Sequence, residues 1–157
     1  MRTIALGLAV FSLAAAASAA DYQLKMTAKA HKELVVRGYF GGSTCESSGS
    51  VEIDLNIPPK GGIVCMRSGM VRVENIWSGN YQNCIGKRIR GVNVIYIPFR
   101  RFTGLDTMRY TVTMSMTRTY EVEISVEAGE AKAAGASSAP SEPQQEGPMP
   151  VCPALVS

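Results

Sequence analysis

The chain has 157 residues, of which 46% are hydrophobic and 18% are charged, and its formal net charge is +3 at pH 7. This length suits one domain with one hydrophobic core. The charge lies too close to zero to support nucleic acid as the partner, so the composition gives no indication of a nucleic-acid-binding protein.

The first twenty residues have the pattern of a cleavable export signal. Arg2 precedes an apolar run from Ile4 to Ala17, and Ala17-Ser18-Ala19 fits the small-x-small rule for cleavage. The run is too short to cross ~30 Å of hydrocarbon, and no basic stop-transfer cluster follows it. We therefore expect a mature chain that starts at Ala20 or Asp21, is periplasmic or secreted, and has no membrane span.

Period-two alternation of apolar and polar residues indicates β-strands in the first half of the mature chain. It is clearest at 51–57, where Val51, Ile53, Leu55 and Ile57 share one parity. The segment 58–62 ends this strand, because proline lacks a ladder donor and glycine relieves turn strain. The other expected strands cover residues 23–28, 34–40, 63–66 and 70–77, with Ser68-Gly69 between the last two.

The second half reads as a strand, an irregular turn and further strand. Residues 92–98 form the first strand, Pro98 closes it, and Gly104 and Asp106 supply the turn. Apolar residues then keep one parity from Met108 to Val126, which as a single strand of about 3.3 Å per residue would measure ~60 Å. The necessary break, near residues 116–119, preserves the parity only if it is a three-residue loop or a bulge.

No segment shows a sustained helical period, and short strands separated by turn signals predict an all-β fold. We expect one β-sandwich of about seven strands over residues 21–127. From residue 128 on, the chain contains five of its eight prolines and almost no large apolar side chain. Such a segment cannot bury enough surface to offset its ordering entropy, so we expect residues 128–157 to be a flexible tail.

The four cysteines favour disulfides, because an exported chain with an even cysteine count usually carries them. Cys45 and Cys84 lie in loops beside presumed core strands, and a bridge between them closes a loop worth on the order of 4 kcal/mol. A bridge between Cys65 and Cys152 would attach the tail to the sandwich. The alternative for this second pair is a buried Cys65 thiol and a free Cys152 that links another chain.

Residues 96–110 contain Tyr96-Ile97-Pro98, then Phe102-x-Gly104-x-Asp106-x-x-x-Tyr110. This order resembles the Tyr-x-Pro, Phe-x-Gly-x-Asp-x-x-x-Tyr segment of bacterial cadherin-like and immunoglobulin-like (Ig-like) domains. The segment 57–64 is similar to the Pro-x-x-Gly-x-Val hairpin that precedes it in such modules. The resemblance implies a β-sandwich that serves as a spacer or an interaction surface, and it implies no chemistry. Arg100-Arg101 and Met108 depart from the residues that family members commonly have there.

The sequence indicates no catalytic residue, no metal site and no cofactor. His31 is the only histidine, and the chain has no His-x-x-x-His or Cys-x-x-Cys spacing. We expect Asp106 to bind nearby backbone amides and so to fix the turn before Tyr110. Calcium is the alternative for Asp106, but no run of clustered acids supplies the roughly six to eight oxygens that calcium needs.

A group of cations is the one candidate binding site. Lys87, Arg88, Arg90, Arg100, Arg101 and Arg109 fall within 23 residues, and Asp106 is the only acid among them. If the strands that flank Pro98 are neighbours, several of these cations share one edge of the sandwich and form an anion-binding site. Lys87, Arg88, Arg90, Arg100 and Arg101 are the residues expected there. The alternative is an edge strand guarded against pairing, because lysine and arginine deter it.

These observations favour an exported, non-enzymatic Ig-like protein that binds or spaces components of the cell envelope or the extracellular space. Its expected partner is an envelope protein or an anionic polymer. A second hypothesis is a small secreted inhibitor or effector that binds a hydrolase or a host protein through the basic loop. A third, an envelope enzyme with a carboxylate pair, has the least support, because the sequence singles out no such pair. Nothing in the sequence indicates the oligomeric state.

Overall fold

The computed structural model of the chain describes residues 20–42, 45, 49–74, 82–129 and 144–153, and residues 1–19 of the expected export signal lie outside them. The described residues form eight strands and one turn of 3-10 helix. The strands are β1 (Tyr22–Lys29), β2 (Leu34–Tyr39), β3 (Glu52–Ile57), β4 (Gly62–Arg72), β5 (Arg88–Pro98), β6 (Gly104–Thr113), β7 (Thr117–Glu127) and β8 (Gly147–Pro148). The short helix, Gln82–Cys84, lies between β4 and β5.

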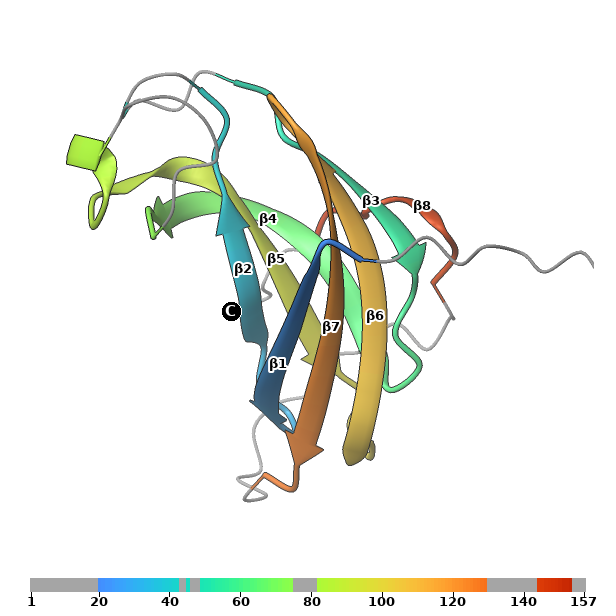
Figure 1. Cartoon of the computed structure of the whole chain (residues 1–157). Helices are drawn as coiled ribbons and strands as arrows, with labels where there is room; N and C mark the ends of the chain where they lie inside the picture. The colour runs from blue at the N-terminus through green and yellow to red at the C-terminus, as the bar shows by residue number, and fades with distance from the viewer. Residues whose placement is uncertain (1–19, 43–44, 46–48, 75–81, 130–143, 154–157) are drawn as a thin grey trace, which may run out of the picture.

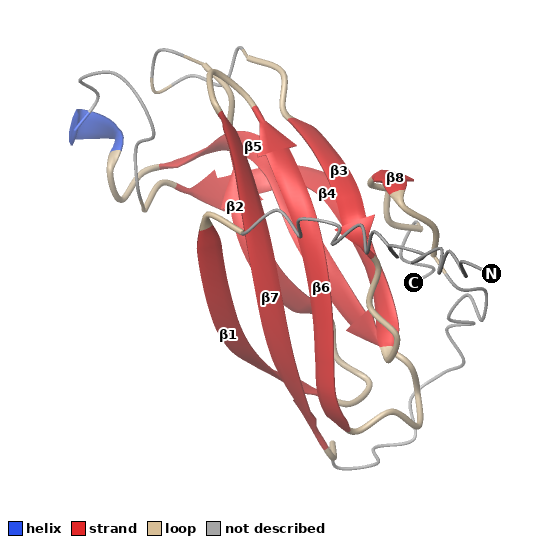
Figure 2. Cartoon of the chain, turned by 45° about the vertical axis from the view of Figure 1, so that its right-hand side comes forward, coloured by secondary structure: helices blue, strands red, loops and turns tan. Residues whose placement is uncertain are grey.

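The strands form two sheets that face each other (Figure 1, Figure 2). One sheet has the order β1-β7-β6-β3-β8 and the other has the order β2-β5-β4. β1 and β7 pair in parallel, whereas the remaining neighbours are antiparallel. The expected all-β sandwich is therefore confirmed.

The core lies between the sheets: β6 and β7 alternate buried and exposed residues, and β4 and β5 contribute further buried residues to the same cluster. Val122, Ile124 and Val126 of β7 are buried, while Glu123 and Glu127 on the other parity reach solvent. Each apolar side chain of this size contributes about 1.5–3 kcal/mol when it leaves water. Facing them are residues of β4 and β5 in the same cluster, among them Val64, Val94 and Tyr96.

The turn between β6 and β7 has the length that the parity of the sequence requires. Thr113 pairs with Thr117, so three residues form the loop, and the Met114 amide donates to the Met116 carbonyl at 3.1 Å. Tyr110 and Tyr120 are paired across the hairpin and are both buried. Of the two forms expected for this break, the three-residue loop is the one found, and it covers residues 114–116 rather than 116–119.

Two local expectations are wrong. Ser68-Gly69 does not separate two strands, because β4 pairs with β5 at every residue from Gly62 to Arg72, and this long pairing outweighs the local turn preference. Ile57 does not share the buried side of Leu55. The register between β3 and β6 shifts between Leu55 and Ile57, and this bulge leaves Ile57 43% exposed.

The end of the chain also differs from the expectation of a flexible tail, because residues 144–153 pack against the sandwich. β8 pairs with β3, and the Met149 amide donates to the Ile53 carbonyl at 2.8 Å. The Met149 side chain is only 2% exposed and belongs to the main core. The composition of this Pro-rich segment predicts a flexible tail, but one buried methionine and one disulfide fix it to the sandwich.

Candidate anion-binding surface

The last part of β4 and the first part of β5 extend beyond β2 as a two-stranded ribbon. β2 ends where Tyr39 pairs with Val92, whereas β4 and β5 continue to the pair of Arg72 with Arg88. We call residues 68–72 and 88–91 the arginine ribbon. Directly opposite residues of an antiparallel pair point to the same face, so Arg72 and Arg88 share a face with Arg90 and its partner Met70. All four side chains are exposed.

The opposite face of the ribbon is covered. Val73 and Ile89 are buried there together with Cys84, and Phe40 packs against this cluster. Cys84 forms a disulfide with Cys45, with an S–S distance of 2.03 Å, which ties the loop before β5 to the loop after β2. The favoured pairing of Cys45 with Cys84 is thus confirmed. Because one face is packed and cross-linked, the face with the arginines is held toward solvent.

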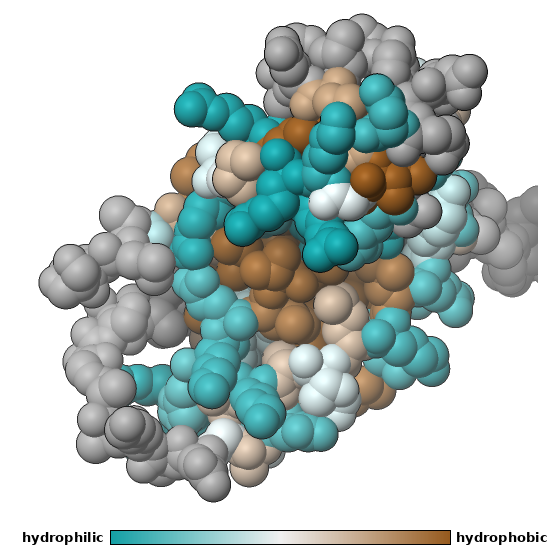
Figure 3. All heavy atoms as spheres, turned by 90° about the vertical axis from the view of Figure 1, so that its left-hand side faces the viewer, coloured by the Kyte–Doolittle hydropathy of each residue, from teal (hydrophilic) through white to brown (hydrophobic). Residues whose placement is uncertain are grey.

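The arginines of the ribbon form a local excess of positive charge. Arg72 and Arg88 are directly opposite each other, and like charges in this arrangement destabilise a strand pair. None of the ion pairs found among the described residues involves Arg72, Arg88 or Arg90; these pairs are Lys25–Glu123, Arg67–Glu33 and Arg109–Glu121. Figure 3 views the side on which β2 and the ribbon end lie; hydrophilic side chains are spread over its upper part, with apolar ones among them and an apolar area below.

The structure does not bring all of the predicted cations together. Lys87, Arg88 and Arg90 lie at the start of β5, whereas Arg100 and Arg101 follow its far end. The nine residues from Arg90 to Pro98 belong to one continuous strand, and their eight steps of about 3.3 Å separate the two groups by about 26 Å. The expected single basic edge is therefore wrong, because β5 begins earlier than its hydrophobic pattern suggests.

Two other arginines differ from the prediction: Arg109 lies away from the arginine ribbon, and Arg72 lies in it. Arg109 belongs to neither group, since its guanidinium binds Glu121 at 2.7 Å. Arg72 belongs to the site but was not among the predicted residues. Its place opposite Arg88 depends on the β4–β5 register, for which the sequence carries no local signal.

Asp106 lies within β6 rather than in a turn, and it has a structural role. Its side chain is buried, and the carboxylate accepts hydrogen bonds from the amides of Lys60 at 2.9 Å, Gly61 at 2.8 Å and Thr107 at 3.0 Å. The Tyr96 hydroxyl donates a fourth, at 2.8 Å. The carboxylate therefore joins β6, β5 and the β3–β4 loop, where the chain passes between the two sheets. The expected binding of backbone amides is found, but the amides of Lys60 and Gly61 are distant in sequence.

Glycine is required for a different reason at each of two positions near Asp106, namely Gly104 and Gly61. Gly104 starts β6 with a φ of 108°, a conformation that favours glycine. A Cβ on Gly61 would meet the Phe102 ring at 2.2 Å, so the ring lies directly against the Gly61 backbone. The residues that carry the family resemblance thus each have a structural reason. Three of them make structural contacts, and Gly104 adopts a backbone conformation that favours glycine: Tyr96, Phe102, Asp106 and Gly104.

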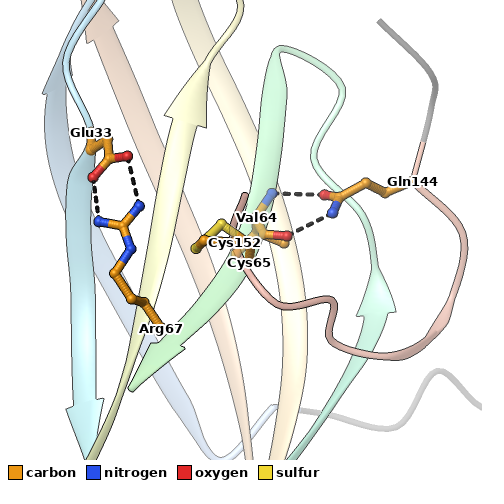
Figure 4. Close-up of a disulfide and its surroundings, with 6 residues drawn as sticks. All are labelled: Glu33, Val64, Cys65, Arg67, Gln144 and Cys152. Carbon is orange, nitrogen blue, oxygen red and sulfur yellow. Dashed lines mark hydrogen bonds and ion pairs between the residues drawn. A yellow bond between two sulfur atoms is a disulfide. The ribbon is translucent and has the colours of Figure 1, made fainter. Parts of the chain in front are cut away.

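The second disulfide, Cys65–Cys152, attaches the C-terminal segment to β4. Figure 4 shows Gln144 reaching the same strand: its side-chain oxygen accepts from the Val64 amide at 2.7 Å and its nitrogen donates to the Val64 carbonyl at 2.6 Å. The Met66 amide donates to the Pro150 carbonyl, and the Cys152 amide donates to the Met66 carbonyl. The predicted pairing of Cys65 with Cys152 is confirmed, and the segment covers the free edge of β4.

The lone histidine and the possible metal ligands form no metal-binding cluster within the described residues. His31 is exposed, in a turn with a φ of 65°. Among the residues that the structure describes, no group of three or more histidines, cysteines and acids is placed to hold a metal ion. Within the same residues, no helix is long and apolar enough to cross a membrane.

Comparison with protein-family models, with curated proteins and with solved structures finds no match to this chain. Its function is therefore argued from its own surface.

Proposed function

We propose that this chain is an exported, non-enzymatic Ig-like protein of the periplasm or the extracellular space, and that its arginine ribbon binds an anionic polymer. The observation that carries the proposal is the direct opposition of Arg72 and Arg88 on an exposed face. A like-charge pair that weakens the fold is the kind of local conflict that functional sites retain, and an anion bound between the two guanidinium groups would relieve it.

The geometry of the ribbon favours an extended ligand. Arg88 and Arg90 are two residues apart on one strand, a separation of about 6.6 Å, and Arg72 lies beside Arg88 on the next strand. Each guanidinium has a planar fork that fits carboxylate and phosphate groups in a bidentate way. Three such forks on an open face suit a polymer with repeated anionic groups better than a single small anion.

The proposed location is supported by the cysteine chemistry and by the N-terminal sequence. The structure contains two disulfides, and such bridges persist in oxidising compartments. The pattern from Arg2 to Ala19 is that of a cleavable signal. Tyr96, Phe102, Gly104 and Asp106 support the Ig-like assignment through their resemblance to bacterial cadherin-like and Ig-like modules.

Two double variants with the same change in net charge test the proposal. Arg72→Gln with Arg88→Gln removes two charges from the ribbon, and Arg100→Gln with Arg101→Gln removes two from the other end of β5. The probe is an acidic polysaccharide, a polyuronate, titrated at low ionic strength by calorimetry. We expect the ribbon variant to bind at least about tenfold more weakly, a loss of about 1.4 kcal/mol, and the control variant to bind like the natural chain. Equal binding by all three proteins would contradict the proposal.

The same variants distinguish the alternatives. Selective binding to vesicles with anionic headgroups, without binding to the polyuronate, would make the ligand a lipid surface. Capture of one stoichiometric enzyme from the envelope, lost in the ribbon variant, would favour the inhibitor hypothesis instead.

A further inference from the structure

Arg37 lies on β2, the edge strand of the three-stranded sheet, and its side chain faces the other sheet. The register of β2 with β5 shifts between Val35 and Arg37, and this bulge directs Arg37 toward the facing sheet. Its guanidinium carbon lies 5.6 Å from the centroid of the Tyr120 ring on β7. Arg37 is only partly exposed, and none of the ion pairs of the described residues includes it.

The floor of this site is a row of tyrosines across three neighbouring strands. Tyr22 of β1 stacks on Tyr120 with centroids 5.2 Å apart, and Tyr120 stacks on Tyr110 of β6 at 5.4 Å. The Tyr39 and Tyr110 hydroxyls are hydrogen-bonded at 2.8 Å. Burial is the largest effect on the pKa of Tyr39, Tyr110 and Tyr120 and raises all three, so these hydroxyls stay protonated at neutral pH.

A second guanidinium reaches the same tyrosines. Arg118 lies two residues before Tyr120 on β7, and its guanidinium carbon is 5.3 Å from the centroid of the Tyr22 ring. Arg118 also hydrogen-bonds to the Tyr120 side chain, and both Arg37 and Arg118 act electrostatically on that tyrosine. Tyr22 is 41% exposed, so the site reaches solvent at its outer end.

We propose that Arg37 and Arg118, supported by the row of tyrosines, form a seat for one oxyanion, a carboxylate or a phosphate group. A cation that is partly removed from water requires compensation, and an aromatic face supplies only part of it. An oxyanion that reaches both guanidinium groups would accept hydrogen bonds from each and bring a negative charge beside two cations. The seat comes from β2, β7 and β1, so it does not depend on the function proposed for the arginine ribbon.

Tyrosine absorbance measures the seat directly, because four of the six tyrosines of the chain line it. The full oxidised chain is titrated with inorganic phosphate and, separately, with acetate, each against chloride at the same ionic strength. We expect a saturable near-ultraviolet difference spectrum with at least one of the two anions. Saturation by phosphate alone or acetate alone identifies the preferred group, and a response to neither anion overturns the proposal.

Variants assign the signal to the seat. Arg37→Gln and Arg118→Gln are each expected to raise the Kd of the anion at least about tenfold. The ribbon variant (Arg72→Gln with Arg88→Gln) should leave the titration unchanged. Arg37→Lys keeps a charge and a long stem but loses the planar fork, so it tests the site if Arg37→Gln fails to fold; we expect several-fold weaker binding. Titrations unchanged in all seat variants, or lost in the ribbon variant alone, would overturn the proposal.

Discussion

The replacement Asp106→Asn tests a buried polar contact that joins the two sheets. The buried carboxylate accepts hydrogen bonds from three backbone amides and one tyrosine hydroxyl, at 2.8–3.0 Å. Asparagine has nearly the same shape, so the change removes the charge and one acceptor oxygen without leaving a cavity. If the remaining oxygen keeps the Lys60 and Thr107 amides, the new NH₂ group faces the Gly61 amide, and two donors then oppose each other.

The expected cost follows from these contacts. A lost hydrogen bond to a charged acceptor costs about 1.5–3 kcal/mol, and the buried Gly61 donor left without a partner adds about 1–3 kcal/mol. The Tyr96 hydroxyl can rotate to accept from the new NH₂ group, so its bond need not be lost. We therefore expect Asp106→Asn to lower the free energy of unfolding by about 3 kcal/mol or more. At about 4 °C per kcal/mol, the Tm falls by ~12 °C.

The measurement is thermal unfolding of the oxidised chain followed by circular dichroism, with Asp54→Asn as the matched control. Asp54 lies on β3 in the same sheet, and its side chain is exposed. The control should melt within about 2 °C of the natural chain, because exposed substitutions rarely change stability by more than ~0.5 kcal/mol. If Asp106→Asn melts with the control, the carboxylate does not join the sheets as we describe.

Two further predictions concern stability. Arg67 donates to both carboxylate oxygens of Glu33 at 2.9 Å (Figure 4), and this hydrogen bond holds the Glu33 pKa below its usual 4.5. A carboxyl whose pKa is lowered by folding stabilises the folded chain at neutral pH, and this stabilisation is lost as the pH falls. The natural chain should therefore exceed Glu33→Gln in free energy of unfolding by at most ~1 kcal/mol at neutral pH, and this difference should shrink as the pH falls below 4.5. A difference that stays constant with pH would refute the prediction. Met149→Ala should cost about 2–5 kcal/mol in urea unfolding, since Met149 is 2% exposed, and Met116→Ala, 39% exposed, should cost under ~1 kcal/mol. Equal costs would place residues 144–153 outside the folded core.

Most of the fold follows from patterns that are local in sequence. The alternation from Met108 to Val126 predicts two strands with either a three-residue loop or a bulge between them, because both keep one parity buried, and the structure has the loop. Bulges are less visible: Val51 to Ile57 alternates without a break in the sequence, yet the shift after Leu55 turns Ile57 outward. The fixed position of residues 144–153 depends on Met149 and Cys152, two residues in an otherwise tail-like composition.

The two proposed binding surfaces are less predictable from the sequence, because they depend on which strands are neighbours. Arg88 and Arg90 are close in sequence and were expected to act together, but their grouping with Arg72 requires the β4–β5 register. Arg100 and Arg101 are near Arg88 and Arg90 in sequence but far from them in the fold, since the two pairs lie at opposite ends of β5. Arg37 and Arg118 meet at Tyr120 although they come from opposite sheets and lie 81 residues apart, and no sequence pattern connects them.

The salt dependence of polyuronate binding tests the arginine ribbon most directly. Ionic contacts on an exposed face weaken as added salt shortens the Debye length below ~10 Å, so the slope of log Kd against log salt concentration reports how many charges take part. We predict a shallower slope for the ribbon variant (Arg72→Gln with Arg88→Gln) than for the natural chain, and an unchanged slope for the control (Arg100→Gln with Arg101→Gln). Parallel slopes for all three proteins would contradict binding through the ribbon.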